Sequence, residues 1–365
     1  MHRGQKILTV SIWGQTLGKL ALTPNNICVF EYNIDYLKKG VSVSPFYLPL
    51  RDGLFTAKQQ PFDGLFGVFA DSLPDGWGNL LIDRLLKKHQ IQPASLNILD
   101  RLSLVGNNGM GALSYHPQIG FKETEDNSNI QYLAAEVEKI LNENYDDALE
   151  LLFNKAGSSG GARPKVLLAV DGKQWLVKFR LSLDPENIGQ IEYQYSLIAK
   201  KCGILMPETR LFEDKYFGVQ RFDSKGKERY HVHTASGLLY ASHRFPSLDY
   251  TELLKATMAI SANMEEVERM FRLMVFNVLT GNKDDHAKNF SFLLKDKKWI
   301  LSPAYDLVLS TGFNDNHSTT IAGQGNPDKK DLFKVAENVG FPPKKAINVF
   351  DEVYEGCKEI RVKGW

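Results

Sequence analysis

Hydrophobic and polar residues alternate along the first fifty residues, in the stretches ILTVSIWG, TLGKLALTP and ICVFEY. Gly14, Gly18 and the turn residues 24–26 (PNN) separate these short apolar runs. Because a strand places successive side chains on opposite faces, this pattern predicts a small antiparallel sheet or barrel. The leucines that follow Gly78 recur at helical spacing and lead into basic residues, which predicts a helix.

A second β-rich region follows the polar stretch 121–129 and a predicted helix over residues 130–141. VLLAVDGKQWLVKFR holds Asp171-Gly172 between two alternating runs, which is a strong hairpin signature. LFEDKYFGVQRFD predicts another pair of strands. Between the two pairs, residues 188–201 have a helical pattern that ends at Gly203.

From Tyr250 onward the pattern is mainly helical. SANMEEVERMFRLMVFNVLTGN predicts a long helix with Asn263 and Glu266 at capping-box spacing and Gly281 as its end. One apolar face is expected from Val267, Phe271, Met274 and Val278. The chain therefore predicts an α+β, two-lobed fold, with a β-rich module over 1–110, a β-rich lobe over 111–245 and a helical lobe over 246–365.

Composition and charge narrow the class of protein. The chain has 365 residues, of which 43% are hydrophobic and 24% charged, so it is expected to fold throughout. Lys and Arg number 44 and Asp and Glu 43, and this balance does not favour tight nucleic-acid binding by the chain alone. Cys28, Cys202 and Cys357 are too far apart for a metal spacing and suit a reducing compartment. With no secretory leader and no apolar run near ~18 residues, we expect a cytoplasmic protein.

One polar loop has a spacing that suggests a metal and phosphate site. It lies in FNVLTGNKDDHAKNFSFLLKDKKWILSPAYDL, residues 276–307, where Asn289 follows Asp284 by five positions and Asp306 follows a predicted hairpin. Phosphoryl transfer needs a carboxylate to accept a hydroxyl proton, and an asparagine and a second carboxylate to hold Mg²⁺. The alternative is a polar loop whose side chains cap local turns.

The β-rich region offers residues for a nucleotide. In WLVKFR the apolar side chains of Trp175, Val177 and Phe179 point to one face of the predicted strand. Lys178 therefore points to the other, where a rigid lysine could contact ATP phosphates or could be simply exposed. Glu192, on the following helix, could pair with Lys178 or be an exposed glutamate.

A glycine-rich loop, GSSGGARPK, precedes the hairpin at residues 157–165. Its small residues would let the backbone N–H groups around Gly160, Gly161 and Ala162 approach phosphates closely. The loop has no Walker A register, so it is a different kind of phosphate loop if it is one.

Three motifs in order resemble the HipA-type bacterial serine/threonine kinases, which are toxins of toxin–antitoxin pairs. They are FADSLPDGWGNLL, then SSGGARPK with LVKF and VQRFD, then GNKDDHAKNFSFL with SPAYDL. The resemblance spans nearly the whole chain and implies a kinase-like fold that uses ATP and Mg²⁺.

By position, the resemblance makes Asp284 the catalytic base and Asn289 and Asp306 the Mg²⁺ ligands. Lys178 would hold the ATP phosphates. The inter-lobe hinge that receives the adenine would be formed by Gln220, Arg221 and Phe222. Ser158 would be the autophosphorylated serine, with Ser159 adjacent to it. A phosphate there would repel ATP from the loop and inactivate the kinase.

The resemblance also implies partners. They are a small helix-turn-helix antitoxin of the HipB kind, operator DNA bound only through that complex, and a protein substrate. In the best-known case the substrate is an aminoacyl-tRNA synthetase, and another translation factor is an alternative. No membrane partner is expected.

Three other functions remain open from the residues. A small-molecule phosphotransferase of the aminoglycoside-kinase kind shares the Asp-x4-Asn spacing and the later aspartate. A catalytically silent co-repressor would use only the antitoxin contact. A hydrolase metal site would recruit His286 together with Asp284, Asp285 and Asp306, but a set with one histidine and an asparagine suits Mg²⁺ better. In the kinase interpretation Asp285 and His286 support the loop, and His286 does so by hydrogen bonding.

Overall fold

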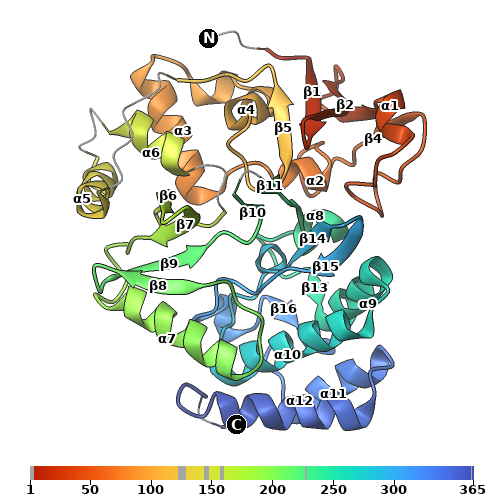
Figure 1. Ribbon diagram of the computed structural model, residues 1–365, viewed down its shortest axis with the longest axis vertical. Helices are drawn as coiled ribbons and strands as arrows, with labels where there is room; N and C mark the ends of the chain where they lie inside the picture. The colour runs from red at the N-terminus through yellow and green to blue at the C-terminus, as the bar shows by residue number, and fades with distance from the viewer. Residues whose placement is uncertain (1–3, 122–128, 144–147, 157–159, 227, 363) are drawn as a thin grey trace. The chain divides into compact units, whose positions relative to one another are not determined.

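A computed structural model describes residues 4–121, 129–143, 148–156, 160–226, 228–362 and 364–365 (Figure 1). The chain packs into two compact units. The first unit comprises Met1–Gly189 and Arg210–Val232, and the second comprises Gln190–Thr209 and His233–Trp365. Ser158 and Ser159 lie outside the described residues.

The first unit begins with a five-stranded antiparallel sheet in the order β4-β3-β2-β1-β5 (Figure 1). Its strands are β1 (Ile7–Ile12), β2 (Gln15–Leu22), β3 (Cys28–Tyr32), β4 (Leu54–Thr56) and β5 (Leu113–His116). Every second residue of β1 is buried, which confirms the alternation expected from the sequence.

The sequence suggested that Gly18 separates two apolar runs, but Gly18 lies inside β2. It is next to a bulge in β1 between Val10 and Ser11. A Cβ atom at Gly18 would lie 2.2 Å from the carbonyl oxygen of Glu31. Glycine is therefore required there because β2 and β3 approach each other too closely for a side chain.

Helices and short turns complete the first module: α1 (Ile34–Leu37), α2 (Gly67–Ala70), α3 (Gly76–Lys88), η1 (Pro93–Ser95) and α4 (Ile98–Val105). Then follow α5 (Ile130–Leu141) and α6 (Leu149–Ala156). The helices predicted near Gly78 and over 130–141 are α3 and α5. Asn97 and Asp100 form a reciprocal capping box at the start of α4.

The second sheet of this unit has the order β6-β7-β9-β8 and is formed by β6 (Lys165–Val170), β7 (Lys173–Lys178), β8 (Thr209–Phe212) and β9 (Tyr216–Gln220). A two-stranded ribbon, β10 (Ser224–Lys225) and β11 (Glu228–Arg229), follows β9. Asp171 and Gly172 both have left-handed φ angles, 53° and 72°, so the predicted hairpin turn is confirmed.

One buried cluster joins α3, α5 and α6 to β6 and β7. Trp77 and Leu81 of α3 lie in it with Trp175 and Val177 of β7, all of them almost fully buried. A helix of the N-terminal module is thus part of the core that supports the second sheet.

The second unit is mainly helical, which agrees with the predicted α+β class. Its helices are α7 (Ile188–Lys201), α8 (Ala235–Leu239), α9 (Tyr250–Ser261), α10 (Met264–Thr280), α11 (Lys329–Asn338) and α12 (Pro343–Gly356), with the short turns η2 (Ala287–Asn289) and η3 (Phe313–Asp315). β12 (His231–Thr234), β14 (Ser291–Lys295) and β15 (Lys298–Leu301) form one sheet, and β13 (Leu248–Asp249) pairs with β16 (Thr319–Thr320). No helix in the described residues combines the length and apolar character of a membrane span.

The long predicted helix is α10, and its apolar face is buried, as expected. The predicted capping box is wrong. Asn263 caps the helix by accepting a hydrogen bond from the Glu265 N–H (2.9 Å). Glu266 instead points into the core, where its Oε2 accepts from the Leu301 N–H (2.9 Å) and pairs with Arg269. The end of β15 presents an N–H group that needs a buried acceptor, and local spacing cannot reveal this.

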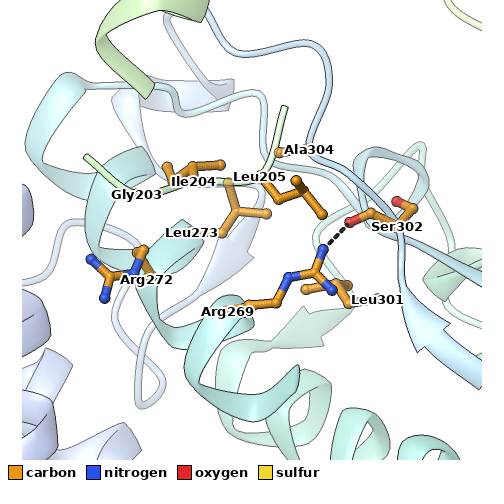
Figure 2. A pocket seen from close by; sticks show the side chains of 9 residues that line it. All are labelled: Gly203, Ile204, Leu205, Arg269, Arg272, Leu273, Leu301, Ser302 and Ala304. Atoms are coloured by element: carbon orange, nitrogen blue, oxygen red, sulfur yellow. Dashed lines mark hydrogen bonds between the residues drawn. The ribbon is translucent and has the colours of Figure 1, made fainter. Parts of the chain in front are cut away.

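A small pocket lies between α10, residues 203–205 and the end of β15 (Figure 2). Figure 2 shows the Arg269 guanidinium turned toward Ser302, whose carbonyl it contacts at 3.1 Å. Arg272 donates to the Cys202 carbonyl at 3.1 Å and to Glu352 at 2.7 Å. Both cations are already engaged by acceptors of the protein, so the pocket is a structural junction rather than an anion site.

Candidate active site

The candidate catalytic loop connects α10 to β14. Gly281, with a left-handed φ of 67°, ends α10 as predicted. Asn282 donates to the Asn277 side chain at 3.0 Å. Asp284 is exposed, but its backbone N–H donates to Ser310 Oγ at 2.9 Å. The main chain at Asp284 is therefore anchored while the residue remains accessible to a substrate.

The five-residue spacing from Asp284 to Asn289 closes the loop. Asn289 Nδ2 donates to the backbone carbonyl of Asp284 at 2.7 Å. Because the amide nitrogen is used in this contact, the amide orientation leaves Oδ1 as the acceptor end of the side chain. An oriented oxygen of this kind fits a Mg²⁺ ligand.

Asp306 follows β15, as the sequence suggested, and has a left-handed φ of 58°. The preceding residue fixes its position: the Tyr305 hydroxyl donates to the Lys288 carbonyl at 2.6 Å and lies 2.6 Å from Ser291 Oγ. The Tyr305 side chain thus links the residue before Asp306 to the residue before Asn289. Sequence reasoning missed Tyr305, whose only sign was its place before the aspartate.

Asp285 differs sharply from Asp284 because it is fully buried. Its Oδ2 accepts from the Tyr250 hydroxyl and from His317 Nδ1, both at 2.9 Å. Its Oδ1 accepts from the N–H groups of Ser318 (2.9 Å) and Thr319 (3.3 Å). Burial and the Asp285 charge raise the pKa of Tyr250 well above its ordinary value, so this hydroxyl keeps the proton that it donates.

The four hydrogen-bond donors around Asp285 argue against the hydrolase metal site. Both carboxylate oxygens are occupied by donors of the protein, which leaves Asp285 unsuited to a metal. No group of three His, Cys, Asp or Glu side chains placed to hold a metal occurs among the described residues. The arrangement fits Asp285 as support for the loop.

His286 gives only part of the expected support. Its ring lies edge-on to that of His243, with centroids 6.3 Å apart. Within the described part of the chain, His286 Nδ1 is buried without a hydrogen-bond partner. The support comes from the main chain instead, because the His286 carbonyl accepts from the Asn289 N–H at 2.8 Å.

The first unit holds the nucleotide-binding candidates. Lys178 ends β7 and is half-buried, while Trp175 and Val177 are buried on the other face, as predicted. The Lys178 ammonium lies 5.7 Å from the centre of the Phe217 ring. Glu192, on α7 in the second unit, is buried, so its alternative as an exposed glutamate is wrong.

The described part of the glycine-rich loop comprises residues 160–165, and residues at the start of α3 contact it. Asp75 Oδ2 accepts from the Gly161 N–H at 3.2 Å. The Trp77 backbone N–H donates to the Gly161 carbonyl (3.2 Å), and Trp77 Nε1 donates to the Lys165 carbonyl (3.1 Å). One N–H group that we expected to face phosphate is thus bound by Asp75. Nothing local in the sequence indicated this contact.

Of the predicted hinge residues, Gln220 is the last residue of β9, and Arg221 and Phe222 follow it. Arg221 donates to Asp223 through Nε at 2.8 Å and Nη2 at 2.6 Å, so its guanidinium is paired with a carboxylate of the protein. Asp223 is fully buried and also accepts from the Gly111 N–H at 2.7 Å. This network ties the hinge segment to the loop that precedes β5.

Comparison with known families identifies both halves of the chain. The model of the HipA-like C-terminal domain matches residues 157–360, which is more than half of the chain. The model of the HipA N-terminal domain matches residues 8–116. The two matches occur in the order in which the motifs occur.

Curated relatives and a solved structure extend the comparison. "Putative kinase Y4dM" from Sinorhizobium fredii is 24% identical over 348 residues, covering 86% of this chain and 79% of that protein. "Putative kinase Y4mE" from the same organism is 36% identical over 77 residues, covering 21% and 18%. A chain from the Shewanella oneidensis MR-1 toxin–antitoxin complex of HipA, HipB and operator DNA matches with a TM-score of 0.71 and 19% identity, covering 97% and 90%. That likeness shows a common fold.

Proposed function

Because the chain belongs to the HipA family, we propose that it is an ATP-dependent serine/threonine protein kinase and the toxin of a type II toxin–antitoxin pair. The observation that carries this proposal is the loop closed between Asp284 and Asn289, to which the hydroxyl of Tyr305, the residue before Asp306, is hydrogen-bonded at Lys288. This arrangement supports a site in which Asp284 accepts a proton and two oxygen ligands from separate segments would hold Mg²⁺.

The candidate site residues have distinct roles in the proposed reaction. Asp284 accepts the proton of the substrate hydroxyl, and its anchored backbone keeps the carboxylate in place. Asn289 Oδ1 and the Asp306 carboxylate would hold Mg²⁺, which neutralises charge on the phosphates when it is bound. Lys178 contacts the ATP phosphates, and Glu192 is its proposed partner.

Further residues proposed to bind the nucleotide belong to the first unit. Gly160, Gly161 and Ala162 belong to the proposed phosphate loop, and Gln220, Arg221 and Phe222 to the hinge for adenine. The engaged guanidinium of Arg221 indicates that the hinge offers main-chain groups rather than this side chain.

The biological partners are proposed on the family's pattern. A HipB-like helix-turn-helix antitoxin would bind the chain and supply most of the DNA affinity, which agrees with the balanced charge. The likeness to a chain from a HipA–HipB–operator complex supports this partner. The substrate would be a cytoplasmic translation protein, such as an aminoacyl-tRNA synthetase, whose modification would arrest growth.

Autophosphorylation gives a direct test. Incubation with ATP and Mg²⁺ is expected to add one phosphate to the intact protein, and Ser158→Ala is expected to abolish the addition. Ser159→Ala is the matched variant and is expected to retain it. No added mass, together with turnover of a small aminoglycoside alcohol, would instead support a small-molecule phosphotransferase.

Tyr305→Phe tests the Mg²⁺ arrangement. The variant keeps the ring but loses the contacts to Lys288 and Ser291, which should cost about 1 kcal/mol of folding free energy. We expect the Mg²⁺ concentration for half-maximal autophosphorylation to rise roughly five- to ten-fold, because Asp306 is held less firmly near Asn289. Tyr36→Phe, which loses a hydroxyl contact to the Val41 carbonyl in the first unit, is the control. An equal Mg²⁺ requirement in all three proteins would contradict this role.

A further inference from the structure

The segment that follows η3 contacts the catalytic loop on both sides of Asp284. Ser318 Oγ donates to the Lys283 carbonyl at 3.0 Å, and Thr319 Oγ1 donates to the Asp285 carbonyl at 2.6 Å. The Asp285 carboxylate accepts from three residues of the same segment, 317–319. The backbone of Asp284 is therefore held between two residues that bind one segment.

His317 is the side chain that completes this arrangement. It is buried, and its backbone N–H donates to the Gly325 carbonyl at 2.7 Å. Its Nδ1 shares the Asp285 Oδ2 atom with the Tyr250 hydroxyl, which also accepts from Asn277 Nδ2 at 3.0 Å. A buried carboxylate needs all its donors, because a charge left without them is strongly destabilising.

We propose that His317 is a positioning residue for phosphoryl transfer, which acts on the Asp284 backbone through Asp285. The proposal rests on the kinase function proposed above. His317 does not touch the reacting atoms. It fixes the Asp285 carboxylate by a hydrogen bond from Nδ1, and Asp285 in turn fixes the residue beside the base. A displacement of about 1 Å at a reacting group can cost about 100-fold in rate, so small changes at His317 should be visible in kcat.

Two substitutions at His317 separate the hydrogen bond from the packing. His317→Leu removes the donor but fills similar space. His317→Asn restores a donor, because an asparagine Nδ2 can occupy the place of Nδ1. We expect the leucine variant to lower kcat roughly 10- to 100-fold and the asparagine variant to stay within about three-fold of wild type. The KM for ATP should change little in either, since the proposed phosphate lysine, Lys178, belongs to the other unit.

A second readout does not depend on activity. Hydrogen–deuterium exchange of the peptide covering residues 281–290 should be faster in His317→Leu than in wild type and near wild type in His317→Asn. His231→Leu is the control, because His231 is equally buried but contacts Val43 in the first unit. It should leave exchange in this peptide unchanged.

The outcomes distinguish the inference from the proposed function. If wild type transfers no phosphate, the kinase function fails, and exchange alone decides whether His317 holds the loop. If wild type is active but the leucine and asparagine variants have equal kcat and equal exchange, the positioning role is wrong. If both variants changed kcat and the KM for ATP to the same extent, His317 would have only a general packing role.

Discussion

Asp284→Asn is expected to lower the rate of autophosphorylation by about 1,000-fold, within the range for loss of a general base. The carboxylate is the only group changed. Two contacts of the Asp284 main chain are retained: its N–H donates to Ser310 Oγ, and its carbonyl accepts from Asn289 Nδ2. Nucleotide binding and folding should therefore be close to those of wild type.

The measurement is a single-turnover time course followed by intact mass, with ATP affinity determined separately. Asp296→Asn is the matched control: it makes the same chemical change at an exposed turn of the β14–β15 hairpin, at a left-handed φ of 50° that asparagine accepts. Growth arrest should follow the same order, with wild type and Asp296→Asn toxic and Asp284→Asn harmless. Equal toxicity of all three would mean that phosphoryl transfer is not the cause of the growth arrest.

Asp223→Ala is expected to lower the free energy of unfolding by about 3–5 kcal/mol, because it leaves one partner of a buried ion pair alone. Arg221 would keep its charge at a largely buried site, and the Gly111 N–H would lose its acceptor. The loss should appear as a lower midpoint in urea unfolding. Asp35→Ala removes an exposed pair with Lys38 and should leave the midpoint unchanged. A similar midpoint for both variants would show that the Asp223 network contributes little.

The same residue should make stability depend on pH. Burial alone would raise the pKa of Asp223, but the hydrogen bonds and charge of Arg221, with the Gly111 N–H, hold it below its ordinary value. The pKa is lower in the folded than in the unfolded protein, so the stabilisation is present above pH ~4 and is lost as pH falls through the folded value. The difference in unfolding free energy between wild type and Asp223→Ala should therefore shrink below pH ~4.

Local pattern was enough to predict the elements that carry the candidate site. Asp171-Gly172 predicted the hairpin that presents Lys178, because few residue pairs adopt two successive left-handed conformations. Gly281 predicted the end of α10 for the same reason. The spacing from Asp284 to Asn289 is a short-range property, and the loop closes over that distance.

The sequence did not predict contacts between segments far apart in the chain. Asp75 accepts a hydrogen bond from the glycine-rich loop, and Glu266 accepts one from the Leu301 N–H instead of capping α10. His317 donates to Asp285. In each case a buried or partly buried polar group takes a partner that the fold brings near, and the partner satisfies a hydrogen bond that water cannot.

The sequence by itself therefore determined the β-rich and helical regions, their turns and the chemical types at the candidate site. The spacing to Asn289 had already distinguished Asp284 from Asp285, and the tertiary structure decided how each of the two carboxylates is surrounded. Asp284 is exposed and anchored by its backbone, whereas Asp285 is buried under four donors. The two carboxylates differ in burial because distant segments surround Asp285, and spacing along the chain does not indicate which segments these are.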